Sequence, residues 1–278
     1  MNYFMDNWTP LITPLAIIFI ALLVVSIVFL RNNRALAEKL CYYILGFTIL
    51  YKGFHYIIYC IILKNEWVNQ IPVEISQLSY FLCPLAFFSR NKWLRDGGAF
   101  VGIIAGGVQL LAITVAPYRF ADSGLSVIEF YESTFMHYFV FWGGMVQVCC
   151  IEPLKFKNIW KTYLVFLGVV LWGVLASFTW KFGTDPGYPD APANIGFVQR
   201  CEGVLPDSIV EKMPWLTQNH LFILPYVALF LVITAGIYLI SNLCMRNVPP
   251  QEPSIYGMGW SGFRKFLKTN DVAPKESK

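Results

Sequence analysis

The sequence predicts an all-α integral membrane protein, a polytopic bundle of seven transmembrane helices. Two features of the composition support this fold class. Of the 278 residues, 56% are hydrophobic and only 14% are charged, whereas an ordinary soluble domain has about a quarter charged residues. The mean hydropathy is +0.54, and apolar runs of about 20 residues, the length that crosses a bilayer, recur along the chain.

Seven apolar segments are long enough to be transmembrane helices, and they form one transmembrane domain over residues 1–245. The first segment is expected to be retained rather than cleaved as a signal peptide. Residues 1–9 contain no Lys or Arg, and the apolar run that follows is too long for a signal h-region. The predicted spans cover residues 10–30, 40–63, 71–89, 97–117, 125–150, 158–181 and 219–243.

The distribution of basic residues predicts the orientation of the bundle. Of the 21 Lys and Arg residues, 15 lie in alternate segments, namely 31–39, 90–96, 151–161 and the tail after 243, and five lie in the other connections. Since cytoplasmic loops are enriched in Lys and Arg, the N-terminus is predicted to lie outside and the C-terminus inside. An even number of spans would break this alternation. The chain is therefore predicted to be a multi-pass protein of the cell membrane.

Two segments outside the predicted helices have a distinctive composition. The external loop 182–218 contains five prolines and is either a lid or binding loop or a solvated linker. The tail 246–278 is predicted to be cytoplasmic and basic. Within it, residues 260–268 place aromatic side chains opposite basic ones, which suits a short helix on the anionic inner leaflet or a soluble turn.

Several classes of ligand are not indicated. The basic residues lie at the ends of apolar segments, so the net charge of +4 predicts no nucleic-acid binding. The seven cysteines are odd in number and include no CxxC pair, so neither a disulfide framework nor a metal site is predicted. The last span contains no lysine, which excludes a retinal Schiff base, and no nucleotide-binding motif is present. No cofactor is therefore predicted. The "GIIAGG" stretch at 102–107 is interpreted as a close-packing feature.

Polar and ionisable side chains inside the predicted spans indicate a functional site, because such groups are rare in membranes. With the orientation above, they lie in the outer half or near the midplane, and the inner half is nearly free of them. Polar groups in lipid must meet one another or water, so we expect one polar cavity that opens outward. Its candidate residues are Lys52, His55, Glu74, Ser76, Gln77, Ser79, Glu129, Glu132, His137 and His220.

Structural interpretations of these residues stay open. Lys52 would form an ion pair with Glu74 or with a glutamate of the fifth span and lock the bundle. Glu129 and His220 would lie at the headgroup boundary. The serines of the third span would bond to a carbonyl one turn back or let helices pack closely. His137 is the hardest to explain without a function, because it lies near mid-depth below two carboxylates.

Three stretches of the chain resemble, in order and spacing, the YwaF-type bacterial integral membrane proteins. They are "QIPVEISQLSYFLCPLAFFSRNK", "SVIEFYESTFMHYFVF" and "NIGFV…GVLPDSIVEKMPWL". The resemblance covers roughly residues 40–245. That family is similar to a eukaryotic transmembrane acyltransferase of ether phospholipids and, more distantly, to membrane lipid hydrolases of the androgen-induced-gene type. These relatives imply a nucleophile–histidine pair inside the membrane that acts on acyl esters.

The resemblance assigns family positions to particular residues of this chain. The family histidine falls on His137, the asparagine on Asn194 and the proline of the first motif on Pro72. Two positions depart from the family pattern, because the nucleophilic cysteine falls on Ser76 and the adjacent motif histidine falls on Glu74.

These assignments imply an acyl-ester enzyme. Serine is a feasible nucleophile when a base removes its proton, and His137 would be the base for Ser76. Glu74 or Glu132 would orient the imidazole. The donors that stabilise the oxyanion would be Gln77 and Asn194.

Three classes of function follow from the sequence. The first is acyl transfer to, or hydrolysis of, membrane lipids, which would then be substrate as well as environment. The second is transport or binding of a small polar solute or a proton, although no inverted repeat is evident. The third is a non-catalytic accessory membrane subunit, in which the polar residues join the helices.

Overall fold

The computed structural model describes residues 2–61, 72, 75–115, 127–180, 184–185, 188–192, 212 and 223–249. Each of the seven predicted apolar segments coincides with an α-helix, so the all-helical fold class is confirmed. The helices are α1 (Asn2–Leu30), α2 (Arg34–Ile61), α3 (Ile75–Ser89), α4 (Lys92–Val115), α6 (Val127–Val146), α7 (Ile159–Trp180) and α10 (Ile223–Met245).

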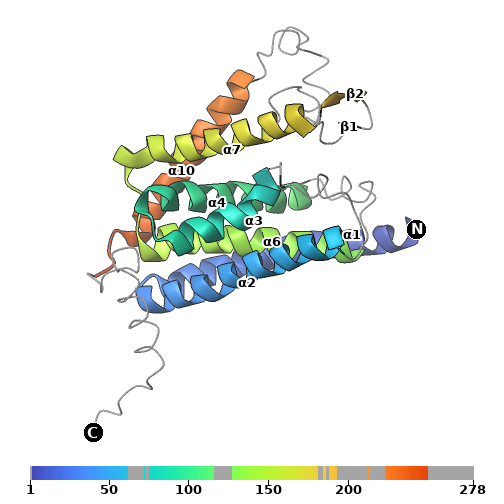
Figure 1. Cartoon of the computed structure of the whole chain (residues 1–278). Coiled ribbons are helices and arrows are strands. Elements are labelled where there is room, and N and C mark those ends of the chain that lie inside the picture. The colour runs from blue at the N-terminus through green and yellow to red at the C-terminus, as the bar shows by residue number, and fades with distance from the viewer. Residues whose placement is uncertain are drawn as a thin grey trace.

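The helices pack side by side, with α4 in the middle of the bundle (Figure 1). α4 contacts α3, α6 and α7, while α2 contacts α3 and α6. α1 packs against α4 and α6. α7 and α10 lie on the opposite side of α4 from α2, and α10 is inclined to the other helices (Figure 1). This arrangement brings α2, α3 and α6 together, and these three helices carry most of the predicted site.

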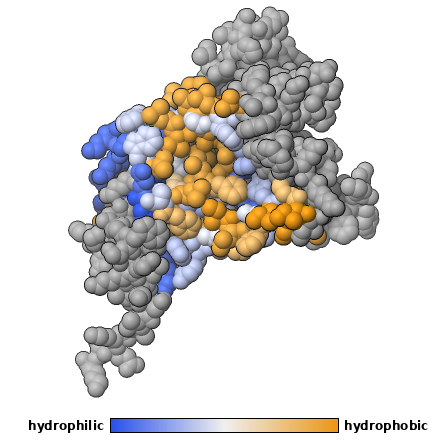
Figure 2. Space-filling model, viewed as in Figure 1, coloured by the Kyte–Doolittle hydropathy of each residue, from blue (hydrophilic) through white to orange (hydrophobic). Residues whose placement is uncertain are grey.

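The basic connections meet at one end of the bundle. The Cys150 thiol lies 3.8 Å from the Ile27 carbonyl oxygen and joins the end of α6 to the end of α1. An ion pair of 2.7 Å between Arg95 and Glu152 joins the start of α4 to the residues after α6. Figure 2 shows hydrophilic residues gathered at one end of the visible face, beside a broad apolar surface. These contacts place the end of α1, the start of α4 and the residues after α6 at the same end of the bundle.

Three helices begin earlier than the sequence predicts, and two of these differences change where charges are buried. α1 begins at Asn2 rather than near residue 10. α2 begins at Arg34 rather than near residue 40, and α4 begins at Lys92 rather than near residue 97. Arg95 and Asp96, which were expected in a loop, are therefore helical and buried. Arg95 donates a hydrogen bond to the Asp96 carboxylate and forms an ion pair with Glu152, and both contacts offset the loss of hydration. Charged groups are thus buried at the end of the bundle where almost none were expected.

The fifth predicted span is not a regular helix throughout. A π-helix, η2 (Gln147–Ile151), follows α6, and a 3₁₀ turn, η3 (Phe156–Asn158), precedes α7. A π-turn leaves backbone groups that need other partners. Here Ser241 of α10 donates to the Val148 carbonyl at 2.6 Å and accepts from the Leu154 amide at 2.9 Å. α10 is thereby fixed to the end of α6.

The outer surface of the helices is apolar, as expected for a membrane protein. Large hydrophobic side chains stand exposed, with Phe29 75% and Val232 69% exposed. Among the described residues, three helical stretches are long and apolar enough to cross a membrane, and two more are apolar but shorter. The three are Trp93–Leu111, Phe130–Ile151 and Val227–Met245, and the shorter two are Pro14–Leu30 and Ile75–Ser89. Exposed apolar surface of this extent is typical of a surface that contacts a membrane or another protein.

Glycines let α4 approach α6 closely. A Cβ atom added at Gly106 would overlap the carbonyl oxygen of His137, and one added at Gly102 would lie 2.8 Å from the Val140 carbonyl oxygen. Both glycines belong to the "GIIAGG" stretch, so its interpretation as a close-packing feature is confirmed. The same contact holds the backbone of His137 in place.

Replacing Gly106 by alanine is expected to destabilise the protein by about 1–3 kcal/mol, because the added methyl group must displace α6. Gly236→Ala in α10 is the matched control, since nothing lies within 4 Å of its added Cβ. That control should be neutral or stabilising by up to about 1 kcal/mol, because alanine favours helix. Thermal unfolding of the detergent-solubilised protein measures both changes. Equal midpoints for Gly106→Ala and the wild type would contradict the packing argument.

The remaining predicted segments are described only in part. Strands β1 (Thr184–Asp185) and β2 (Tyr188–Pro192) form an antiparallel ribbon in which Thr184 faces Pro192. This ribbon lies within the predicted external loop 182–218, and the choice between lid and linker stays open. The amphipathic segment 260–268 lies outside the described residues.

Candidate functional site

His137 lies on α6 and is buried at the contact between α6 and α3. Its Nδ1 atom is 2.7 Å from the carbonyl oxygen of Ser133, one helical turn earlier. The Ser133 hydroxyl oxygen is 3.3 Å from the same nitrogen. Because a carbonyl can only accept a hydrogen bond, we assign the proton of the neutral imidazole to Nδ1. Nε2 is then the basic nitrogen of the ring.

Tyr80 of α3 faces His137 across the helix contact. Its hydroxyl oxygen is 2.7 Å from Nδ1 and 3.3 Å from Nε2 of the imidazole. The two rings meet edge to face, with centroids 5.2 Å apart. Because the proton is assigned to Nδ1, the Tyr80 oxygen accepts from that N–H at the shorter distance and holds the ring orientation.

A buried ion pair lies next to this contact. Lys52 Nζ of α2 is 2.6 Å from Glu132 Oε1 of α6, and the two side chains are 10% and 16% exposed. His55 Nδ1 lies 3.6 Å from the same carboxylate oxygen. The Lys52 ammonium also lies 5.0 Å from the centre of the Tyr80 ring, a distance at which a cation is attracted to the ring face. The polar side chains of α2, α3 and α6 therefore form one connected group, from His55 through Glu132, Lys52 and Tyr80 to His137.

The first turns of α3 bring its polar residues to this group. Ser76 precedes Tyr80 by four residues, which places both on the same face of the helix. Ser76 and Gln77 are half-buried, and Ser79 is fully buried. The Ser79 hydroxyl donates to the Ser76 carbonyl at 2.6 Å, which agrees with the structural interpretation of that serine. Ser76 thus lies one helical turn before Tyr80, the residue of α3 whose hydroxyl contacts His137 of α6.

The structure brings together only part of the predicted site. Lys52, His55, Glu132 and His137 lie in the connected group, and Ser76 lies on the helix face beside it. Lys52 pairs with Glu132, one of the partners that the sequence left open. Glu129 lies in α6, but its side chain is not described. The predicted residues outside the described part of the chain are Glu74, Asn194 and His220.

The sequence of the chain as a whole places it in a family. The TMEM164 family model matches residues 3–238, which is nearly the whole chain. The protein belongs to the TMEM164 family. This is a membrane protein family, so the expectation of a membrane protein is confirmed, whereas the YwaF-type relationship is not. No curated protein and no solved structure matches this TMEM164-family chain.

Sequence reasoning missed Tyr80 in this member of the TMEM164 family. A tyrosine in an apolar span is usually a packing residue, and its hydroxyl carries no ionisable signal near neutral pH. The spacing of four residues after Ser76 is the signal that would have found it. Only the packing of α3 on α6 shows that this hydroxyl reaches His137.

Proposed function

We propose that this TMEM164-family protein transfers or hydrolyses acyl chains of membrane lipids, with Ser76 as nucleophile and His137 as general base. One observation carries this proposal. The buried His137 imidazole is held by the Ser133 carbonyl, 2.7 Å from Nδ1, and by the Tyr80 hydroxyl of α3, and Ser76 precedes Tyr80 by one helical turn. The choice of substrate follows the resemblance drawn above from three stretches of the sequence.

The proposed reaction proceeds through an acyl-serine intermediate. The Ser76 hydroxyl oxygen attacks the ester carbonyl of the lipid while its proton passes to His137 Nε2. The ester bond then breaks, and the leaving alcohol takes the proton back from Nε2. A second alcohol or water attacks the acyl-Ser76 ester by the same route in reverse and regenerates the serine. Tyr80 positions the imidazole throughout.

The proposed topology has seven spans, with the N-terminus outside and the C-terminus inside the cell membrane. The gathering of the basic connections 31–39, 90–96 and 151–161 at one end supports this orientation. The site then lies in the outer half of the membrane, where acyl esters of the outer leaflet are within reach.

Ser76→Ala is expected to reduce acyl turnover to background, because the proposed nucleophile is removed. Ser79→Ala is the matched control, since that hydroxyl bonds to the backbone of its own helix, and it should retain activity. The assay uses purified protein in nanodiscs with isotope-labelled diacyl and ether phospholipids, with acyl release or transfer followed by mass spectrometry. Wild-type protein that leaves every one of these lipids intact would contradict the acyl function.

A second candidate function is transport or binding of a small polar solute or a proton. The connected group of ionisable side chains favours it, because half-buried His55 leads through Glu132 to buried Lys52. This candidate requires the charges of Lys52 and Glu132 to take part in the function. A variant that removes both charges therefore separates it from a purely structural ion pair.

A further inference from the structure

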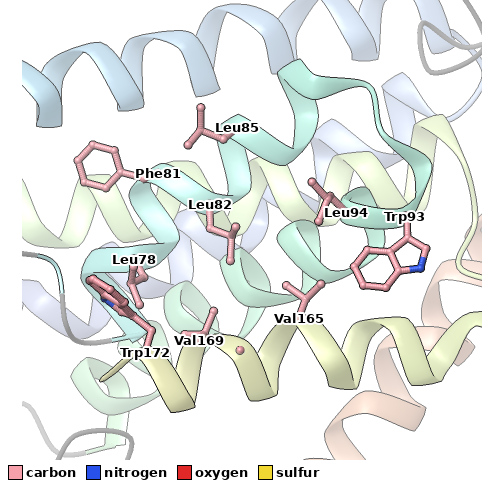
Figure 3. A pocket seen from close by; sticks show the side chains of 10 residues that line it. Leu78, Phe81, Leu82, Leu85, Trp93, Leu94, Val165, Val169 and Trp172 are labelled. Carbon is pink, nitrogen blue, oxygen red and sulfur yellow. The ribbon is translucent and has the colours of Figure 1, made fainter. Parts of the chain in front are cut away.

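An apolar groove lies along the side of the bundle, between α7 and the hairpin of α3 and α4 (Figure 3). Its volume is about 420 Å³, within the range of about 300–1,000 Å³ that is usual for small-molecule sites. The lining comes from all three helices and consists of Leu78, Phe81, Leu82, Leu85, Trp93, Leu94, Val165, Gly168, Val169 and Trp172.

The chemistry of the groove restricts its occupant to hydrocarbon. Apart from two tryptophans, every lining side chain is aliphatic or phenyl, or is the bare Cα of Gly168. An apolar lining favours contact with hydrocarbon over contact with water. Leu85, Trp93 and Gly168 are exposed, so the groove opens sideways from the helices. In a membrane protein that side faces lipid, and acyl chains are the hydrocarbon present there.

The two ends of the groove are different, and one of them lies at the level of the first turn of α3. Trp172 and Leu78 lie at one end and Trp93 at the other (Figure 3). The indole N–H of Trp172 donates to the Pro72 carbonyl at 2.9 Å. This bond ties α7 to the residues just before α3, so the Trp172 end lies at the first turn of α3, which contains Ser76.

We propose that this groove binds one acyl chain of a membrane glycerophospholipid, with the methyl end toward Trp93 and the carboxyl end toward Trp172. In that orientation the ester lies at the first turn of α3. The statement that this acyl chain carries the ester that reacts rests on the proposed function. The binding of the acyl chain in the groove does not.

Photo-crosslinking tests this proposal without relying on turnover. The probe is a phosphatidylcholine that carries a diazirine in the middle of its sn-2 acyl chain, incorporated in nanodiscs with the full-length protein. After irradiation, mass spectrometry should find the label on groove residues such as Leu82 and Val169. The label on the outward faces of α1 and α10 should be weaker, because lipids there exchange freely.

Two glycine variants provide a matched pair. An added Cβ meets nothing within 4 Å at Gly168 or at Gly236, but only Gly168 lines the groove. Gly168→Leu should reduce labelling of the groove several-fold, and Gly168→Ala should reduce it less. Gly236→Leu should leave it unchanged. All three variants should unfold at temperatures close to that of the wild type, because each new side chain enters open space.

Two results would overturn the groove as an acyl-chain site. One is labelling of Leu82 and Val169 no stronger than that of α1 and α10, and the other is unchanged labelling in Gly168→Leu. Failure of the proposed function would give a different combination of labelling and turnover. Groove labelling with no acyl turnover would contradict the enzyme and support the binding site, whereas turnover with labelling elsewhere would contradict the groove alone.

Discussion

Replacing His137 by alanine is expected to lower acyl turnover by about 10²–10⁴-fold, the usual contribution of a general acid–base group. The variant loses Nε2, the atom proposed to take the Ser76 proton, along with the bonds from Nδ1 to Ser133 and Tyr80. The measurement is turnover per folded protein in nanodiscs, with thermal unfolding recorded in parallel. Added imidazole should restore part of the activity, because it can enter the space that the side chain leaves. A structural defect would not respond to imidazole.

Thr134→Val is the matched control for this variant. Thr134 is also buried on α6, and its hydroxyl bonds to the Phe130 carbonyl of its own helix at 2.8 Å. Its removal should leave turnover close to the wild-type value. Tyr80→Phe should have an intermediate effect, because it removes the hydroxyl that positions the imidazole but keeps the base. Full activity in His137→Ala would contradict the assignment of His137 as the base.

The helices could be predicted from the sequence because a membrane span is a property of one continuous segment. Twenty apolar residues identify a helix whatever its neighbours are, and each of the seven predicted segments coincides with an α-helix. The ends of the helices were less well predicted. A charged residue such as Arg95 is assigned to a loop from sequence, because its partners Asp96 and Glu152 are known only from the structure. The π-turn at Gln147–Ile151 likewise depends on Ser241, nearly a hundred residues later.

The candidate site could be predicted only as a set of polar residues at a common depth. Lys52, Glu132 and His137 were found because ionisable groups in a membrane are conspicuous. Which glutamate pairs with Lys52 depends on the rotation of α2 against α6, and this is set by side-chain packing between segments far apart in the chain. Tyr80 and the groove beside α7 depend on that packing alone. No single segment shows that the Tyr80 hydroxyl reaches His137 or that α7 forms a groove with α3 and α4.

The ion pair between Lys52 and Glu132 is expected to stabilise the folded protein. Removing one partner should therefore lower the free energy of unfolding. Breaking a buried pair leaves an uncompensated charge and costs about 3–5 kcal/mol, whereas replacing both partners by apolar residues of similar size is often neutral. Both side chains are mostly buried, with Nζ and Oε1 only 2.6 Å apart. The appropriate substitutions are Lys52→Met and Glu132→Leu, singly and together.

The two single variants should lower the unfolding temperature by different amounts. Glu132→Leu leaves Lys52 with the face of the Tyr80 ring at 5.0 Å as a remaining favourable contact, worth about 0.5–2 kcal/mol. Lys52→Met leaves Glu132 with His55, 3.6 Å away, which can take up a proton and restore an ion pair. We therefore expect Glu132→Leu to lower the unfolding temperature more than Lys52→Met, and the double variant to recover most of the loss. Recovery of stability together with lipid turnover would identify the pair as structural support for Tyr80 and His137. Recovery of stability with all activity lost would show that the charges themselves take part, and would favour transport of a proton or polar solute instead.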